Sequence, residues 1–238
     1  MRDPGGMTAS ALAAFAALLA DETRARFCLA LLDGRAWTAG ELARHVGVAP
    51  STASEHLGRL VAGGLLAEER QGRHRYVRLA DARTAYLVEE LAAHTEPGPP
   101  AAPTSLRAAG ARSAMARGRT CYDHLAGRLG IAITEAMTVR GLLLQESGFA
   151  LTARGTEWFA ALGLEPLRGR GRRPVVRACL DWTERRPHLA GAAGAELCRY
   201  ALDSGWCVRI GSERAVRVTA EGERALAELL GIAPEALR

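Results

Sequence analysis

The 238-residue chain contains no lysine, so all 31 of its basic side chains other than histidine are arginines. Its net charge is +5 and its isoelectric point is near 9.3. An excess of arginine permits phosphate binding, but mildly basic chains are also common among proteins that never contact nucleic acid. The charge therefore allows a nucleic-acid partner without establishing one.

Long hydrophobic runs are also missing. No stretch approaches the roughly 20 apolar residues that a membrane-spanning helix needs. The apolar run over residues 9–20 follows a single arginine, Arg2, and leads into Asp21-Glu22-Thr23-Arg24, which favours an N-terminal helix over a secretory signal. We therefore expect a soluble, cytoplasmic protein with no membrane partner.

Cysteines are few and scattered, which excludes a disulfide-stapled scaffold and favours reduced thiols. The chain also has no glycine-rich phosphate loop, no nucleophile elbow and no assembled zinc motif. We therefore predict a protein that is not an enzyme and requires no cofactor. With 48% hydrophobic residues, it is long enough for two domains with real cores.

A segment rich in proline and alanine, residues 95–115, divides the chain. Four prolines and a glycine between Thr95 and Thr104 exclude regular helix or sheet. We predict one domain over residues 1–94 and a second over 116–238. The predicted fold class is mainly α with short β-hairpins.

The first domain has the pattern of a winged helix-turn-helix. Thr38-Ala39-Gly40-Glu41 is a capping box that starts a short helix, and Gly47 provides a tight turn before another helix opens at Pro50. Two extended runs then flank Gln71-Gly72-Arg73 and predict a β-hairpin, the wing. A last helix is expected over about residues 81–94.

The second helix and the hairpin carry polar side chains that the core does not need. Short polar groups near a helix N-terminus can reach base edges, and the helix dipole favours phosphate. Arginines at a hairpin tip suit phosphate contact or the minor groove. Alternatively, Ser51 and Thr52 cap the helix and the arginines form a solvated face. The predicted DNA contacts are Ser51, Thr52, Ser54, Glu55, His56, Arg59, Arg70, Arg73, His74 and Arg75.

Residues 8–95 resemble the ArsR/SmtB regulators, through the segments 19–26, 41–43, 48–57 and 60–66 and the Gln71-Gly72-Arg73 hairpin. The resemblance implies a homodimer that pairs through its first and last helices and binds a pseudo-palindromic operator in double-stranded DNA. It also implies repression until an effector lowers DNA affinity. The DNA contacts that the resemblance implies are Ser51, Thr52, Ser54, His56 and Arg59.

Two metal sites found among such relatives can be tested by residue type. The helix before the recognition helix, residues 41–45, has no cysteine and so lacks a thiolate site. On the last helix Asp81 and His94 remain, but Arg83 stands where a histidine would be wanted, and a cation repels a metal. We therefore assign no metal ligands in the first domain.

The C-terminal half repeats itself. Residues 119–123 recur as 177–181, the tetrapeptide His-Leu-Ala-Gly recurs, and 151–155 match 218–222. We predict helix, helix, short hairpin and Thr-capped helix in each copy, over about residues 119–165 and 177–233. This order describes a tandem of degenerate winged-helix-like modules.

The repeated Arg-x-Cys-x-Asp motif with a nearby histidine is the candidate effector site. Thiolate, carboxylate and imidazole are zinc ligands, and an arginine lowers the pKa of a nearby thiol, so a metal or a thiol-reactive species could be sensed. Alternatively, these residues are structural, or a small molecule binds between the copies among Tyr122, Trp158, Trp182, Tyr200 and Trp206. The candidate effector residues are Arg119, Cys121, Asp123, His124, Arg177, Cys179, Asp181, Trp182 and His188.

The leading prediction is an operator-binding repressor whose C-terminal half receives a signal. One alternative is a thiol-dependent enzyme, with Cys121 or Cys179 activated by His124 or His188. Another is a protein-interaction module fused to a DNA-binding domain.

Overall fold

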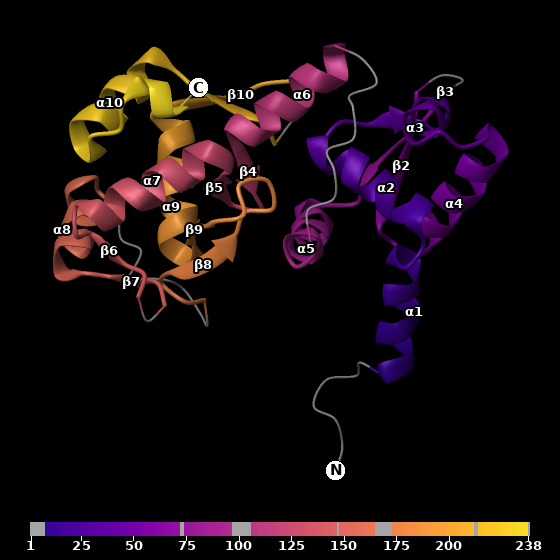
Figure 1. Ribbon diagram of the computed structural model, residues 1–238, viewed down its shortest axis with the longest axis horizontal. Coiled ribbons are helices and arrows are strands. Elements are labelled where there is room, and N and C mark those ends of the chain that lie inside the picture. The colour runs from indigo at the N-terminus through magenta and orange to yellow at the C-terminus, as the bar shows by residue number, and fades with distance from the viewer. Residues whose placement is uncertain are drawn as a thin grey trace. The chain divides into compact units, whose positions relative to one another are not determined.

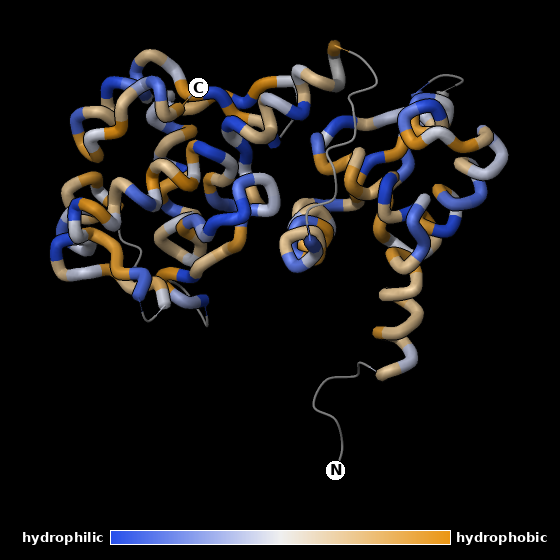
Figure 2. Tube along the Cα trace, in the orientation of Figure 1, coloured by the Kyte–Doolittle hydropathy of each residue, from blue (hydrophilic) through white to orange (hydrophobic). Residues whose placement is uncertain are grey.

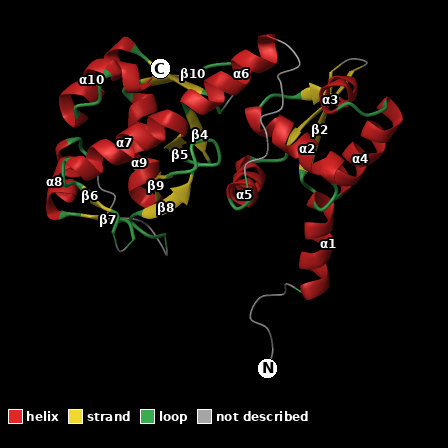
Figure 3. Ribbon diagram, in the orientation of Figure 1, coloured by secondary structure: helices red, strands yellow, loops and turns green. Residues whose placement is uncertain are grey.

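The computed structural model describes residues 8–71, 74–96, 106–146, 148–164, 173–211 and 214–237, apart from the side chains of residues 74, 107 and 108. The chain forms two compact units, residues 1–88 and 89–238 (Figure 1). Each unit is mainly helical, with strands confined to short stretches (Figure 3). The boundary lies ahead of the one predicted after residue 94.

The first unit has the predicted element order. Its helices are α1 (Ala9–Leu19), α2 (Glu22–Ala30), a 3₁₀ turn η1 (Leu31–Asp33), α3 (Ala39–Val46) and α4 (Pro50–Ala62), followed by strands β2 (Leu66–Gln71) and β3 (His74–Leu79). Helix α5 (Ala82–Ala93) starts in this unit and ends in the second. A two-residue strand, β1 (Trp37–Thr38), pairs with β3 and gives an antiparallel sheet of order β1-β3-β2.

Local signals fix the helix-turn-helix. The Thr38 hydroxyl accepts a hydrogen bond from the Glu41 amide, and the Glu41 carboxylate accepts one from the Thr38 amide, so the predicted capping box is confirmed. Helix α3 ends at Gly47, whose φ of 78° is left-handed and suits glycine. Leu57 and Leu60 on the inner face of α4 are buried, as their spacing predicts.

Helix α1 differs from the other helices of the first unit because none of its residues is buried. Figure 2 shows it in apolar colours along most of its length. Leu12 is 61% exposed and Phe15 is 37% exposed. The other residues that the structure describes therefore leave the apolar surface of α1 uncovered.

After the end of α5, the second unit continues with α6 (Leu106–Arg117), which occupies part of the predicted 95–115 linker. Residues 97–105 of that linker lie outside the described residues. Two copies of one element order follow. The first comprises β4 (Arg119–Cys121), β5 (His124–Ala126), α7 (Gly127–Val139), β6 (Leu143–Leu144), β7 (Ala150–Leu151) and α8 (Ala153–Ala161). The second comprises β8 (Arg177–Leu180), β9 (Pro187–Ala190), α9 (Gly191–Asp203), β10 (Cys207–Arg209), β11 (Val216–Val218) and α10 (Ala220–Leu230), and a 3₁₀ turn η3 (Pro234–Leu237) ends the chain.

The structure contains the predicted duplication, since both copies have the same order of elements. The prediction for the first element of each copy is wrong. Each copy begins with a β-hairpin and not with a helix, because the residues around each Cys-x-Asp pair antiparallel with those around the following histidine. The tandem of winged-helix-like modules is accordingly not confirmed. The two copies share one hydrophobic core, built around side chains such as Leu129, Phe159, Leu197 and Leu226.

The repeated Thr-Ala-x-Gly motif starts the last helix of each copy. The hydroxyls of Thr152 and Thr219 accept hydrogen bonds from the amides of Gly155 and Gly222, so both predicted caps are confirmed. The same two hydroxyls donate to the carbonyl oxygens of Gly141 and Gly205, at 2.7 Å in each copy. These bonds tie each helix to the hairpin before it.

Candidate functional site

Helix α4 presents the polar face that the sequence predicts. Ser51, Ser54, Glu55 and Arg59 are exposed and Thr52 is half-buried. Arg59 pairs with Glu55 at 2.7 Å, and the Ser54 hydroxyl donates to the carbonyl of Pro50.

The start of α4 has no side-chain cap. Its N-cap residue is Ala49, followed by Pro50 at the first turn. Ser51 and Thr52 therefore do not act as the N-cap, and the first amides of the helix point out of its end without a capping side chain.

His56 has a different environment from its neighbours on α4. Its side chain is 16% exposed, and its Nδ1 lies 3.5 Å from the Asp21 carboxylate and 3.4 Å from the Arg24 guanidinium. Arg24 also donates to the carbonyls of Ala17 and Leu18 at the end of α1. His56 thus links α4 to the α1–α2 junction, a role that the sequence pattern did not indicate.

The wing is the hairpin formed by β2 and β3, with Gln71 opposite His74. Arg70 is exposed, and Arg75 pairs with Glu68 at 2.6 Å. Arg73 lies outside the described residues, as does the side chain of His74.

In the second unit, the first hairpins of the two copies bring four buried side chains together. Cys121 stands directly opposite His124 in the β4–β5 hairpin, and Cys179 stands opposite His188 in the β8–β9 hairpin. One ligand atom of each residue lies within 4.8 Å of the other three. The two sulfur atoms are 3.9 Å apart, and each of the four side chains is at most 3% exposed.

The two imidazoles have incomplete hydrogen bonding. His124 Nδ1 lies 3.4 Å from the Asp123 carboxylate, but its Nε2 has no hydrogen-bond partner among the described residues. Neither ring nitrogen of His188 has such a partner, although Nδ1 is 3.6 Å from Asp181. Burial, and then the neighbouring His124, lower the pKa of His188 to about 3. The imidazole of His188 is therefore neutral at physiological pH.

Asp181 and Arg119 form a buried ion pair beside this cluster. Arg119 Nη2 donates to both carboxylate oxygens of Asp181, each at 3.0 Å, and Arg119 Nε donates to Glu89 at 3.1 Å. Burial alone would raise the pKa of Asp181, but the charge of Arg119 and the hydrogen bonds from Thr183 and Gly127 lower it. Arg119 is fully buried, so its charge is balanced entirely within the protein.

The two copies of the Arg-x-Cys-x-Asp motif are not equivalent. Arg177 is exposed, whereas its counterpart Arg119 is buried. Asp123 pairs with Arg173, at 2.6 and 2.9 Å, and Asp181 pairs with the arginine of the other copy. The motif therefore brings two cysteines, two carboxylates and the buried Arg119 to this region.

Three residues of this buried network, Glu89, Glu90 and Arg214, were not predicted from the sequence. Glu89 accepts hydrogen bonds from Arg119 and from the Trp182 indole, and Arg214 pairs with it at 2.8 Å. Glu90 accepts a hydrogen bond from the Cys179 thiol at 3.5 Å. The sequence feature that could have indicated the two glutamates is that Glu89-Glu90 stands between apolar residues of a helix.

Cys121 does not become the reactive thiol that a neighbouring arginine predicts. A hydrogen bond with the Cys179 thiol, together with burial, raises the pKa of Cys121. The hydrogen bonds of Arg119 go to other groups, including the carboxylates of Glu89 and Asp181. The hydrogen bond with Cys179 and burial outweigh the influence of the nearby Arg119, so the pKa of Cys121 is raised and not lowered, and its role as a sensor stays a prediction.

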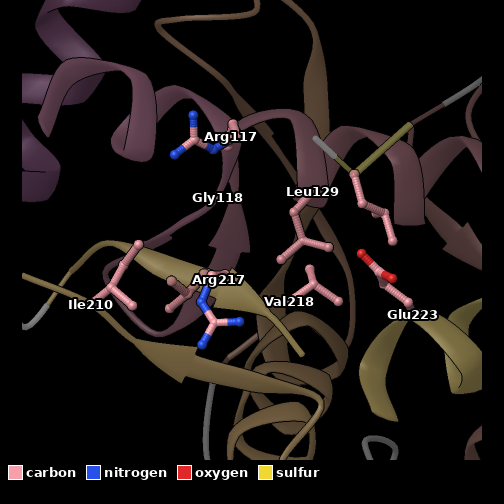
Figure 4. Close-up of a pocket in the computed structure, with 9 residues that line it drawn as sticks. Arg117, Gly118, Leu129, Ile210, Arg217, Val218 and Glu223 are labelled. Atoms are coloured by element: carbon pink, nitrogen blue, oxygen red, sulfur yellow. The ribbon is translucent and has the colours of Figure 1, made fainter. Parts of the chain in front are cut away.

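A separate pocket of about 370 Å³ lies in the second unit, beside the β10–β11 hairpin. Figure 4 shows apolar Leu129 and Val218 on its wall together with charged Arg217 and Glu223. None of the five aromatic residues predicted to surround a ligand lines this pocket. Trp158, Tyr200 and Trp206 belong to the core or pack on it, Trp182 stacks on Arg119, and Tyr122 is 44% exposed.

Comparison with known proteins identifies the chain. A helix-turn-helix domain profile matches residues 19–69. The HTH-type transcriptional regulator YdfF of Bacillus subtilis (strain 168) is 38% identical over 223 residues, which cover 93% of this chain and 97% of that protein. The HTH-type transcriptional regulator CmtR of Mycobacterium tuberculosis is 42% identical over 85 residues, covering 36% of this chain and 71% of CmtR. The chain belongs to the ArsR/SmtB family of transcriptional regulators.

Solved structures match the regulator over a smaller part of its length. The NMR structure of the cadmium sensor CmtR from Mycobacterium tuberculosis has 35% identity and a TM-score of 0.32, covering 40% of this chain and 99% of that one. The repressor BigR from Xylella fastidiosa has 27% identity and a TM-score of 0.35, covering 38% and 91%. Among the described residues of the regulator, no helix is both long and apolar enough to cross a membrane.

Proposed function

We propose that the regulator is a homodimeric repressor that binds a pseudo-palindromic operator through α4 and the wing, and that an effector bound in the second unit releases it. The observation that carries the proposal is the exposed face of α4, which presents Ser51, Ser54 and Arg59. The start of this helix has no side-chain cap. Short polar groups there can reach base edges while the amides face phosphate. Arg70 and Arg75 add charge on the wing.

The uncovered apolar surface of α1 supports dimerisation. Leu12 and Phe15 on this helix, and Leu91 near the end of α5, are exposed large hydrophobic residues. The resemblance to ArsR/SmtB regulators implies pairing through the first and last helices of the DNA-binding domain. Burial of these side chains against a second copy would remove apolar area from water.

Operator binding should depend on Arg59 and on salt. An operator is first selected from a random DNA pool with the full-length protein, and affinity is then measured by fluorescence anisotropy. We expect the affinity to fall steeply as salt rises, because phosphate contacts release counterions. Arg59→Ala should weaken specific binding about 10-fold or more through loss of a base or phosphate contact.

The matched control is Arg26→Ala, which removes an equally exposed arginine of α2 that pairs with Glu22. This variant should bind the operator nearly as tightly as the wild type. If the wild type selected no sequence at any salt concentration, the proposed operator binding would be wrong.

We also propose that the second unit is not an enzyme, and thiol reactivity tests this against the thiol-dependent alternative. All five cysteines are buried, and the pKa of Cys121 is raised. In metal-free native protein we therefore expect all five thiols to react slowly with a disulfide reagent such as DTNB, and all five to react rapidly in denaturant. A single thiol that reacts far faster than the others in the native state would favour a catalytic cysteine.

A further inference from the structure

We propose that Cys121, His124, Cys179 and His188 form a closed tetrahedral site for one zinc ion, and that this ion is the effector of the second unit. The proposed metal binding is argued from the geometry of the cluster alone. The effector part rests on the proposed repressor function.

The donor set fits zinc. Two thiolates and two imidazoles in a tetrahedral arrangement are a common structural zinc site. With Zn–S bonds of about 2.3 Å and Zn–N bonds of about 2.0–2.1 Å, the edges of such a tetrahedron measure about 3.3–3.8 Å. The two sulfur atoms, 3.9 Å apart, already lie close to one edge, and no pair of donor atoms exceeds 4.8 Å.

The two hairpins hold the donors in place before any ion binds. Each supplies one cysteine and one histidine from directly opposed positions, so the site has an approximate two-fold arrangement. A glycine on the helix of each copy packs against the histidine of the other copy: Gly130 faces His188 Cβ and Gly194 faces His124 Cβ. A Cβ added at Gly130 would also lie 2.4 Å from the Leu125 carbonyl oxygen, and one added at Gly194 would lie 2.5 Å from that of Leu189.

Unused polar atoms point to a missing partner. His124 Nε2 and both nitrogens of His188 are buried without hydrogen bonds from the described residues, which is costly unless another group completes the site. A carboxylate stands beside each ring, Asp123 by His124 and Asp181 by His188. Histidine ligands of metals are commonly oriented by such carboxylates.

The arrangement favours a metal over the other candidate signals. A disulfide would require the sulfur atoms to move from 3.9 Å to about 2.05 Å. Attack on an oxidant or electrophile would require exposed thiolates, whereas both thiols are buried. Four protein donors leave no open position on the ion, so the site lacks the water-bound geometry of catalytic zinc.

Zinc binding changes a contact with α5. The ion replaces the protons of the two thiols, and these protons are released to solvent with no change of oxidation state. Metal-bound Cys179 can no longer donate to Glu90, and thiolate and carboxylate then face each other 3.5 Å apart. Glu90 and Glu89 lie on the last turns of α5, which continues from the DNA-binding unit. The loss of this contact gives the ion a means of acting on that helix.

Cobalt(II) titration of the full-length apoprotein tests the site. We expect one Co²⁺ per chain, with the intense visible bands of tetrahedral coordination and a sulfur-to-metal charge-transfer band, both abolished by excess Zn²⁺. Cys121→Ala and Cys179→Ala should each weaken binding by more than about 100-fold, since they remove ligands rather than outer-shell partners. Cys207→Ala is the matched control, because Cys207 is equally buried in the same unit but outside the cluster.

The control variant should give the wild-type spectrum. Absence of tetrahedral bands in the wild type, or their retention in both cluster variants, would overturn the zinc site.

Operator anisotropy with and without Zn²⁺ tests the effector role separately. Zinc should weaken operator binding by the wild type about 10-fold and leave the two cluster variants unchanged. Operator binding that zinc does not alter in the wild type would overturn the effector role. If no operator binding occurs in either state, the proposed repressor function fails, whereas the cobalt spectrum still decides the metal site.

Discussion

Replacing Arg119 with methionine should lower the free energy of unfolding of the second unit by about 3–5 kcal/mol. Arg119 is fully buried and donates to Glu89, to Asp181 and to the Thr183 hydroxyl. Methionine retains much of the side-chain length but leaves Asp181 as a buried charge without its cation. Urea unfolding followed by tryptophan fluorescence reports on this unit, because Trp158, Trp182 and Trp206 belong to it.

The control for this variant is Arg173→Met, which removes the same charge from a partly exposed pair. Arg173 holds Asp123 through two hydrogen bonds, but its side chain is 38% exposed. Such pairs contribute about 1 kcal/mol or less. Equal losses of stability for the two variants would show that burial of Arg119 has no special energetic weight.

Alanine at Gly222 should destabilise the second unit by about 3 kcal/mol. An added Cβ would lie 2.1 Å from the carbonyl oxygen of Trp206, a backbone atom that cannot rotate away. That carbonyl also accepts the Thr219 amide hydrogen bond, so a shift would disturb the helix cap as well. The repeat predicts the same effect at Gly155, where the Leu142 carbonyl oxygen would be 2.0 Å away. Thermal unfolding measured by circular dichroism compares the variants.

Gly110→Ala is the matched control because Gly110 lies within α6 and its added Cβ would meet no atom within 4 Å. We expect this variant to be more stable by about 0.5–1 kcal/mol, since alanine favours a helix interior. A similar loss of stability in all three glycine variants would mean that helix flexibility, and not the carbonyl contact, determines the effect.

Local chemistry explains why the first unit could be predicted closely from sequence. The capping box of Thr38 and Glu41, the left-handed Gly47 and the buried spacing of Leu57 and Leu60 each act within a few residues. Strand β1 was missed because two residues carry no periodicity, and its pairing with β3 is a tertiary contact. The position of His56 against Asp21 and Arg24 depends on helix packing in the same way.

The second unit shows where prediction from one sequence ends. The duplication and its Cys-x-Asp and His positions are visible in the chain, and they select all four residues of the cluster. The hairpins at the start of each copy were mistaken for helices because three- and four-residue strands are too short to show alternation. The cross-copy pairing of Arg119 with Asp181 required the fold, because a repeated motif suggests that each arginine serves its own copy.

X-ray absorption at the zinc K-edge of the full-length regulator, loaded with one equivalent of zinc, gives the most direct test of the zinc site. The coordination proposed for Cys121, His124, Cys179 and His188 predicts two sulfur atoms at about 2.3 Å and two nitrogen atoms at about 2.0–2.1 Å. A first shell of only oxygen and nitrogen atoms would contradict it.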